Sequence, residues 1–303
     1  MLVRFADPTG KARLGLVEGA RLYDLTATGD PRFESLAALL GADEPAAALV
    51  ARVREAARRA PAIDAPGLLE TGRSAAAAGA YELLAPVDAQ EVWAAGVTYK
   101  RSEEARKAES EGAALFYAKV YEAERPELFF KATPSRCSGA FAPVGIRRDA
   151  RWNVPEPELG VVLTSRLEPI GYTVGNDMSC RDIEGENPLY LPQAKVYAKG
   201  CGVGPGIALA DAVPDPAALP ISMRITRRGE EVFSGSTSTA AMKRSISQLV
   251  AYLGRANTFP AGAILLTGTG IVPGDDFTLQ EGDFVEIEIE GVGRLINPVV
   301  VVG

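Results

Sequence analysis

The sequence of 303 residues contains no histidine. This absence excludes every Ser-His-Asp or Cys-His catalytic mechanism, every histidine general base and every metal site that uses imidazole ligands. Any proton transfer by this protein must therefore be carried out by Glu, Asp, Lys or Tyr side chains, or by water.

Cysteine is also scarce. The three cysteines, Cys137, Cys180 and Cys201, are odd in number and widely spaced, which predicts reduced structural thiols rather than a disulfide framework or a zinc cluster. The longest apolar runs are too short or too interrupted to span a bilayer, and no apolar signal core follows Met1. We therefore expect a cytoplasmic protein that does not act at a membrane.

Clusters of positive charge are missing as well. The net charge is −7, and the sequence has no basic run. Nucleic-acid-binding proteins present basic patches to the phosphates of their partner. We therefore expect no nucleic acid among the partners of this protein.

Two regions of different character divide the chain. The first, residues 1–85, is rich in alanine and combines short strand patterns with a helical segment at residues 43–59, which begins at Asp43, Glu44 and Pro45 and ends in arginines. The second, residues 86–303, consists mostly of short β-type runs separated by Gly and Pro. We predict an α+β, mostly β fold, with a small N-terminal α/β domain (1–85) and a β-rich domain (86–303).

Two glutamates lie close together in the stretch VPEPELGVVL, residues 154–163. The neighbouring prolines disfavour a helix, and in a strand Glu156 and Glu158 project from the same face. Nineteen residues after Glu158, Asp177 ends a further extended segment. Three carboxylates with room for water suit Mg²⁺, with Mn²⁺ or Ca²⁺ also possible. The alternative is a solvated acidic strand edge.

Several spaced motifs occur in a fixed order: ELFFKATPS, VPEPELGVV, GYTVGNDMSCRD, LPQAKVY and LLTGTGIVPGDDF. In this order they resemble the fumarylacetoacetate hydrolase family across about residues 90 to 303. The resemblance implies a β-roll catalytic domain in which Glu156, Glu158 and Asp177 bind Mg²⁺ or a similar ion. It also implies a small-molecule 2-oxo acid substrate, chelated by that ion, and a homodimer or homotetramer.

One motif departs from the family. Its hydrolases often carry NYxxHxxE, whose His and Glu activate the attacking water, whereas the matching stretch here is TYKRSEEA. Tyr99 fits, but Ser102 replaces the histidine and Ala105 replaces the glutamate. The stretch DIEGENPLYLPQAKVY instead resembles a branch that removes water from 2-keto-3-deoxypentonates and yields 2,5-dioxopentanoate. We therefore predict a hydro-lyase that loses a C3 proton to form an enolate and then eliminates the C4 hydroxyl.

Three residues are candidates for the catalytic chemistry. Lys195 stands at the position of the family lysine, which implies a base or a partner for an oxyanion. Glu127, Phe129 and Lys131 alternate and would share one strand face, so we propose Glu127 as the second acid/base group and Lys131 as its electrostatic partner. A structural ion pair is the alternative. The sequence leaves open which of Lys195 and Glu127 is the base.

Further residues are candidates for binding the substrate. Thr269 and Gly268, in TGTG, can present a hydroxyl and backbone amides to a carboxylate. Arg181 and Asp182 are predicted to form an ion pair that steadies Asp177. The remaining candidates lie in loops or in the branch-like insert, and they are Arg136, Ser135, Tyr99, Tyr190 and Gln193.

Two other functions remain open at this point. An acylpyruvate-type C–C hydrolase or an oxaloacetate decarboxylase of the same family becomes possible if Glu103 or Glu104 swings over the metal as a lid base. A member without catalytic activity would bind 2-oxo acids or serve as an oligomeric scaffold. The substrate epimer and chain length are not decided by these motifs.

Overall fold

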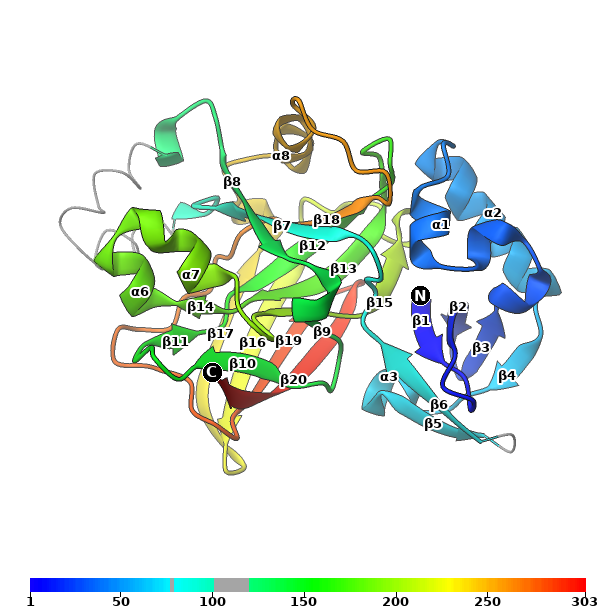
Figure 1. Ribbon diagram of the computed structural model, residues 1–303, viewed down its shortest axis with the longest axis horizontal. Helices are drawn as coiled ribbons and strands as arrows, with labels where there is room; N and C mark the ends of the chain where they lie inside the picture. Colours follow the sequence, from blue (N-terminus) through cyan, green and yellow to red (C-terminus); the bar gives the residue numbers. More distant parts are fainter. Residues whose placement is uncertain (77–78, 101–119) are drawn as a thin grey trace.

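The computed structural model describes residues 1–76, 79–100 and 120–303. Its strands form two large β-sheets and one short ladder, and the helices lie around them (Figure 1). Strands dominate the described residues, so the prediction of an α+β, mostly β fold is confirmed. Among the helices of the described segments, none is long and apolar enough to cross a lipid bilayer.

The N-terminal region forms one end of the longer sheet, with helices packed against it (Figure 1). Its longest helix, α2 (Ala46–Arg59), begins directly after Pro45, and Leu49, Val50 and Val53 are buried on its inner face, as the helical pattern predicts. The strands are β1 (Leu2–Ala6), β2 (Ala12–Glu18), β3 (Arg21–Asp24), β4 (Ala62–Asp64), β5 (Arg73–Ala76) and β6 (Gly79–Leu84). The shorter helices are η1 (Thr26–Thr28), η2 (Pro31–Phe33), α1 (Leu36–Leu40) and α3 (Leu68–Thr71).

The central strands of the longer sheet are covered on both faces. Every residue of β12 (Pro157–Leu163) is buried. Val162 packs in the same cluster as Leu49 of α2, whereas Val161 packs with Ile287 on the opposite side. Alternate side chains of a strand point to opposite faces of the sheet. A strand such as β12, which is covered by apolar side chains on both faces, therefore has an almost unbroken run of apolar residues. The neighbouring strands are β7 (Glu91–Gly96), β8 (Glu127–Ala132), β13 (Pro169–Asp177), β15 (Cys201–Leu209) and β18 (Ala263–Leu266).

The second sheet covers one face of the first. In β16 (Pro220–Arg227) exposed and buried residues alternate, because one face packs into the core and the other faces solvent. Helix α8 (Ile246–Leu253) begins at Ser245, whose hydroxyl accepts a hydrogen bond from the backbone amide of Gln248. The other strands of this sheet are β10 (Val144–Arg147), β17 (Glu230–Ser238), β19 (Phe284–Ile289) and β20 (Gly293–Val302).

The strand order explains how distant segments meet. The longer sheet runs β4-β3-β2-β1-β15-β13-β12-β18-β7-β8, and the second runs β10-β20-β19-β16-β17. Leu2 of β1 pairs with Ile207 of β15, which joins the N-terminal strands to the larger region. The domain boundary between residues 85 and 86, which falls between β6 and β7, stays a prediction.

Short elements surround the ends of β12 and β13. Helices α6 (Arg181–Glu186) and α7 (Leu191–Lys195) pack against each other, beyond the end of β13 (Figure 1). The remaining short elements are η3 (Pro134–Arg136), β9 (Cys137–Ser138), β11 (Asn153–Val154), β14 (Ser179–Cys180), η4 (Pro188–Tyr190), η5 (Ala210–Ala212) and η6 (Thr239–Ala241).

Candidate active site

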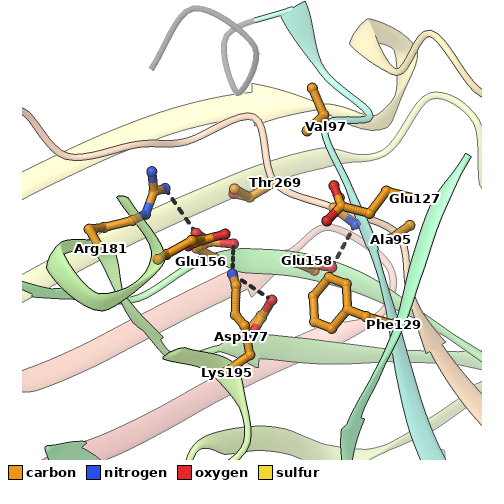
Figure 2. Close-up of a pocket in the computed structure, with 13 residues that line it drawn as sticks. Ala95, Val97, Glu127, Phe129, Glu156, Glu158, Asp177, Arg181, Lys195 and Thr269 are labelled. Carbon is orange, nitrogen blue, oxygen red and sulfur yellow. Dashed lines mark hydrogen bonds and ion pairs between the residues drawn. The ribbon is translucent and has the colours of Figure 1, made fainter. Parts of the chain in front are cut away.

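Three carboxylates meet where β12 and β13 pair. The two strands are antiparallel, with Pro157 opposite Asn176, and the backbone amide of Asp177 donates to the carbonyl of Glu156 at 2.9 Å. Glu156, Glu158 and Asp177 each offer an oxygen, and these oxygens lie within 4.8 Å of one another. All three side chains are buried (Figure 2). The alternative of a solvated acidic strand edge is therefore excluded.

In the described part of the chain, three cations surround these carboxylates. Lys195 Nζ lies 2.9 Å from Glu156 Oε2 and 3.0 Å from Asp177 Oδ2. Lys131 Nζ forms an ion pair with Asp177 Oδ1 at 2.5 Å, and Arg181 Nη2 lies 2.8 Å from Glu156 Oε1. Buried charges persist when they are paired in this way, so Glu156 and Asp177 are held in fixed orientations.

Glu158 lies in a different electrostatic environment. Its Oε2 accepts a hydrogen bond of 2.6 Å from the backbone amide of Gly268. Burial raises the pKa of Glu158 well above its ordinary value, and the charges of Asp177 and Glu156 raise it further. A divalent cation would offset the negative charge that the ionised Glu158 adds to this cluster. Because the cluster offers only carboxylate oxygens, it fits a hard cation such as Mg²⁺.

The cavity beside the cluster is bounded by two further walls. Glu127 and Phe129 point into it from β8, on the opposite side of the three carboxylates from Arg181 (Figure 2). Gly96 of β7 faces Glu127, and any Cβ at position 96 would collide with the Glu127 carboxylate. The loop after β18 contributes Gly268 and Thr269.

Several predicted site residues are brought together here. Glu127, Glu156, Glu158, Asp177, Lys195, Gly268 and Thr269 all line the cavity. Lys131 lies behind the lining and reaches Asp177 instead of pairing with Glu127. Tyr99 is buried, and its hydroxyl has no hydrogen-bond partner among the described residues. Burial raises the pKa of Tyr99, and the nearby charge of Glu158 raises it further.

Other predicted substrate-binding residues lie outside the lining. Arg136 donates a hydrogen bond to Thr133 in the η3 turn, where Ser135 also contacts Thr133. Tyr190 and Gln193 are exposed on η4 and α7. Their roles in substrate binding stay predictions. Ser102, Glu103, Glu104 and Ala105, which bear on the hydrolase alternative, lie outside the described residues.

The predicted ion pair between Arg181 and Asp182 is corrected by the geometry. Arg181 pairs with Glu156, whereas Asp182 accepts a hydrogen bond from the backbone amide of Arg151 at 2.7 Å. Adjacent residues of a helix point roughly 100° apart around its axis, so Arg181 and Asp182 of α6 face different partners. Lys131 and Lys195 are the cations that hold Asp177.

The sequence reasoning missed Ala95, Gly96 and Val97 of the lining, and with them two larger side chains. Phe129 was considered only as a spacer in ELFFK, and Glu184 was not singled out at all, although both line the cavity. Arg181 and Glu184 are the buried residues of α6. Their spacing of three residues, which places them on one helix face, is the signal that could have identified Glu184.

Known proteins resemble this chain over most of its length. Residues 91–300 match the family described as fumarylacetoacetate (FAA) hydrolase C-terminal. The chain is 55% identical over 217 residues to a probable 2-keto-3-deoxyxylonate dehydratase of Haloferax volcanii, covering 72% of this chain and 74% of the relative. It is 48% identical over 217 residues to the 2-dehydro-3-deoxy-D-arabinonate dehydratase of Saccharolobus solfataricus, covering 71% of this chain and 73% of that relative.

Solved structures show the same similarity. A 2-keto-3-deoxy-D-arabinonate dehydratase complexed with magnesium and 2,5-dioxopentanoate has a TM-score of 0.81 and 37% identity, and the match covers 99% of each chain. A fumarylacetoacetate hydrolase from Exiguobacterium antarcticum has a TM-score of 0.69 and 26% identity, again over 99% of each chain. Because the family match spans more than half of the residues and the fold agrees, this chain belongs to the fumarylacetoacetate hydrolase family.

Proposed function

We propose that this protein is a Mg²⁺-dependent hydro-lyase that converts a 2-keto-3-deoxypentonate into 2,5-dioxopentanoate. The observation that carries the proposal is the buried cluster of Glu156, Glu158 and Asp177, found in a chain whose relatives include two pentonate dehydratases. The structural neighbour with magnesium and 2,5-dioxopentanoate agrees with the same assignment. The predicted dehydratase activity therefore agrees with the relatives.

The three carboxylates are the groups that would hold the ion. When bound there, Mg²⁺ supplies positive charge to the carboxylate and 2-oxo oxygens of the substrate, which favours loss of a C3 proton. Lys131, Lys195 and Arg181 keep two of the carboxylates oriented through the ion pairs described above. Removal of such supporting contacts typically lowers metal affinity or activity by about 10- to 100-fold.

The hydrogen bonds of Lys195 support different roles for Lys195 and Glu127. Among the described residues, Lys195 Nζ has three acceptors, because it also donates to Ser179 Oγ at 2.6 Å. Three acceptors satisfy the three N–H groups of an ammonium, which has no lone pair with which to accept a proton. We therefore assign Lys195 as a fixed positive charge and Glu127 as the base.

Glu127 then carries the first proton transfer. Its carboxylate takes the C3 proton, and the electron pair of the broken C3–H bond is stored in the enolate. When the C4–O bond breaks, this pair forms a C3–C4 double bond, and the protonated Glu127 gives its proton to the departing hydroxyl, which leaves as water. Phe129 provides an apolar wall beside Glu127, which limits competing water at that side of the cavity.

A coupled assay tests the proposal. Chelator-treated protein is incubated with 2-keto-3-deoxy-D-arabinonate, with and without Mg²⁺, and an NAD(P)-dependent dehydrogenase reports 2,5-dioxopentanoate. We expect turnover that requires Mg²⁺ and disappears in Glu158→Ala. Cleavage of an acylpyruvate, or release of CO₂ from oxaloacetate, without dehydration would reject the assignment in favour of the hydrolase or decarboxylase. Absence of all three activities would favour a 2-oxo-acid-binding scaffold.

Assembly and location complete the proposal. We propose a homodimer or homotetramer, on the resemblance to the family, and light scattering on the purified protein tests it. We also propose a cytoplasmic location. The three cysteines of the described residues are free thiols, which is typical of a reducing compartment.

A further inference from the structure

The third carboxylate of the metal cluster is positioned in a different way from the other two. Glu156 and Asp177 are held by ion pairs with Lys195, at 2.9 and 3.0 Å. Within the described residues, one hydrogen bond reaches the side chain of Glu158, and it comes from the backbone amide of Gly268 at 2.6 Å. The orientation of the Glu158 carboxylate therefore depends on the direction in which this amide points.

The amide is one end of a peptide group whose other end is also hydrogen-bonded. The carbonyl of the same peptide group belongs to Thr267, and it accepts a hydrogen bond of 2.6 Å from the hydroxyl of Thr98. A chain of hydrogen bonds therefore runs from Thr98, through this peptide group, to Glu158. A hydrogen bond to the carbonyl polarises the peptide and strengthens its N–H as a donor, by about 10–30% per bond. The side chains of Thr98, Thr267 and Glu158 are at most 1% exposed, so bulk solvent does not compete with the chain.

Strand pairing brings these groups together. Strands β7 and β18 are parallel neighbours, so Thr98, which follows β7, meets the loop after β18 at the same edge of the sheet. The amide and the hydroxyl of Thr267 both donate to the carbonyl of Leu159, at 3.1 and 3.0 Å, and Leu159 directly follows Glu158 in β12. These bonds anchor the loop beside Glu158. The bond from Thr98 then fixes the remaining freedom, which is rotation of the planar peptide group that ends in the Gly268 amide.

Gly268 has the conformation that this arrangement requires. Its φ is +89°, in the region that favours glycine. A Cβ at this position would collide with the hydroxyl of Thr98 and would lie 2.9 Å from the carbonyl oxygen of Ala95. Thr98 is itself held in place, because its own carbonyl accepts a hydrogen bond of 2.9 Å from the backbone amide of Lys243. Both partners of the Thr98 hydrogen bond are therefore fixed before a metal binds.

We propose that Thr98 is a positioning residue, which acts through the Thr267–Gly268 peptide group to orient Glu158 for Mg²⁺. This inference rests on the proposed Mg²⁺-dependent function. The part of the cavity lining that the structure describes does not include Thr98, so its hydroxyl acts on the metal site and not on the substrate. Loss of a contact that orients a metal ligand typically lowers metal affinity by about 10- to 100-fold.

The decisive variant is Thr98→Val, which keeps the shape of the side chain and removes the donor. Titration calorimetry of Mg²⁺ into chelator-treated protein, without substrate, measures the Kd. We expect the Kd of Thr98→Val to rise by about 10-fold or more, and the Mg²⁺-induced rise in Tm to shrink accordingly. Thr98→Ser keeps the hydroxyl and should bind Mg²⁺ as the unchanged protein does. Thr98→Cys should lie between Ser and Val, because a thiol is a weak donor.

A matched control separates metal positioning from stability. Thr173 is also fully buried, and its hydroxyl donates to the carbonyl of Gly204 at 3.3 Å, outside the metal cluster. Thr173→Val should lower the Tm of the metal-free protein, since it leaves a buried acceptor without its donor, but it should not change the Kd for Mg²⁺. An unchanged Kd in Thr98→Val as well would overturn the proposal. If Thr98→Val does not fold, equal Kd values for Thr98→Ser and Thr98→Cys would overturn it instead.

Steady-state kinetics distinguishes this role from a catalytic one. In Thr98→Val, the Mg²⁺ concentration that gives half of the maximal rate should rise in parallel with the Kd, and kcat at saturating Mg²⁺ should stay close to that of the unchanged protein. A large loss of kcat with an unchanged Kd would contradict the positioning role. If the unchanged protein binds Mg²⁺ but does not dehydrate the substrate, the proposed function fails alone, and the Kd values still decide the role of Thr98. If it binds no Mg²⁺, both proposals fail.

Discussion

Lys195 and Asp177 form a buried ion pair, with Nζ 3.0 Å from Oδ2 and with side chains 2% and 1% exposed. The pair joins α7 to the end of β13, and it is extended by Glu156 on one side and Lys131 on the other. Removing one member of such a network leaves an uncompensated charge in a buried site. The contact that fixes the position of Lys195 therefore also supports the fold.

Replacing this lysine should affect stability as well as activity. We expect Lys195→Met to lower the free energy of unfolding by about 3–5 kcal/mol, because Glu156 and Asp177 would lose a buried partner. Urea denaturation measures the change. Lys11→Met removes an exposed lysine and should leave stability within about 0.5 kcal/mol of the original value. Equal midpoints for the two variants would contradict the buried network.

Glu158 should destabilise the protein when no metal is present. Because burial raises its pKa in the folded state, its contribution to stability is present at pH values below the unfolded-state pKa and is lost as the pH rises through the folded-state pKa. We expect Glu158→Gln to have a higher Tm than the original protein in chelator at about pH 8, and a difference that vanishes near about pH 4. The variant should also lose the Mg²⁺-induced rise in Tm.

Metal binding should release a proton. In the absence of metal, the raised pKa of Glu158 means that its carboxyl holds a proton to higher pH than an ordinary glutamate, and a cation must displace it. Mg²⁺ affinity should therefore decrease as the pH falls. Titration calorimetry in two buffers of different ionisation enthalpy measures the proton release directly. Heats that are independent of the buffer would contradict this coupling.

Gly96 should be required for the position of Glu127. A methyl group at position 96 would collide with the Glu127 carboxylate, so Gly96→Ala must displace the proposed base. A displacement of about 1 Å can lower a catalytic rate by about 100-fold. We expect kcat to fall by this order while the Mg²⁺-induced rise in Tm persists, because Gly96 does not contribute to the metal cluster. An unchanged kcat in Gly96→Ala would show that catalysis does not depend on the position of the Glu127 carboxylate, which would contradict its role as the base.

Tyr99 offers a test of a predicted substrate contact. Its buried hydroxyl has no hydrogen-bond partner among the described residues, so Tyr99→Phe should leave stability unchanged or raise it. If the hydroxyl binds substrate, KM should rise by about 10-fold, the value of a hydrogen bond of about 1.4 kcal/mol. Steady-state kinetics at saturating Mg²⁺ measures it. An unchanged KM would show that the Tyr99 hydroxyl does not bind substrate and that this side chain only packs in the core.

The metal cluster could be predicted because the residues next to Glu156 and Glu158 in the sequence fix the directions of these two side chains. Prolines around Glu156 enforce an extended chain, and alternation in that chain places Glu158 on the same side. The partner, Asp177, ends the strand that pairs with β12. The family motif supplied Lys195, strand alternation in ELFFK indicated Glu127, and the TGTG stretch indicated Thr269; the cavity contains all three. Arg136, Ser135, Tyr190 and Gln193 were inferred from loop position, which carries no information on the direction of a side chain.

By itself, the sequence narrowed the class of chemistry: without histidine, acid and base work falls to Glu, Asp, Lys, Tyr or water, and closely spaced acidic residues suit a hard cation. It also determined the mostly β fold through short apolar runs broken by Gly and Pro. Only the tertiary structure decided which charged side chains pair with each other. Lys131 pairs with Asp177 and Arg181 with Glu156 because strand pairing and helix packing, not distance along the chain, bring these charges within reach. For the same reason, the structure was needed to show that the buried face of α6 brings Glu184 to the cavity.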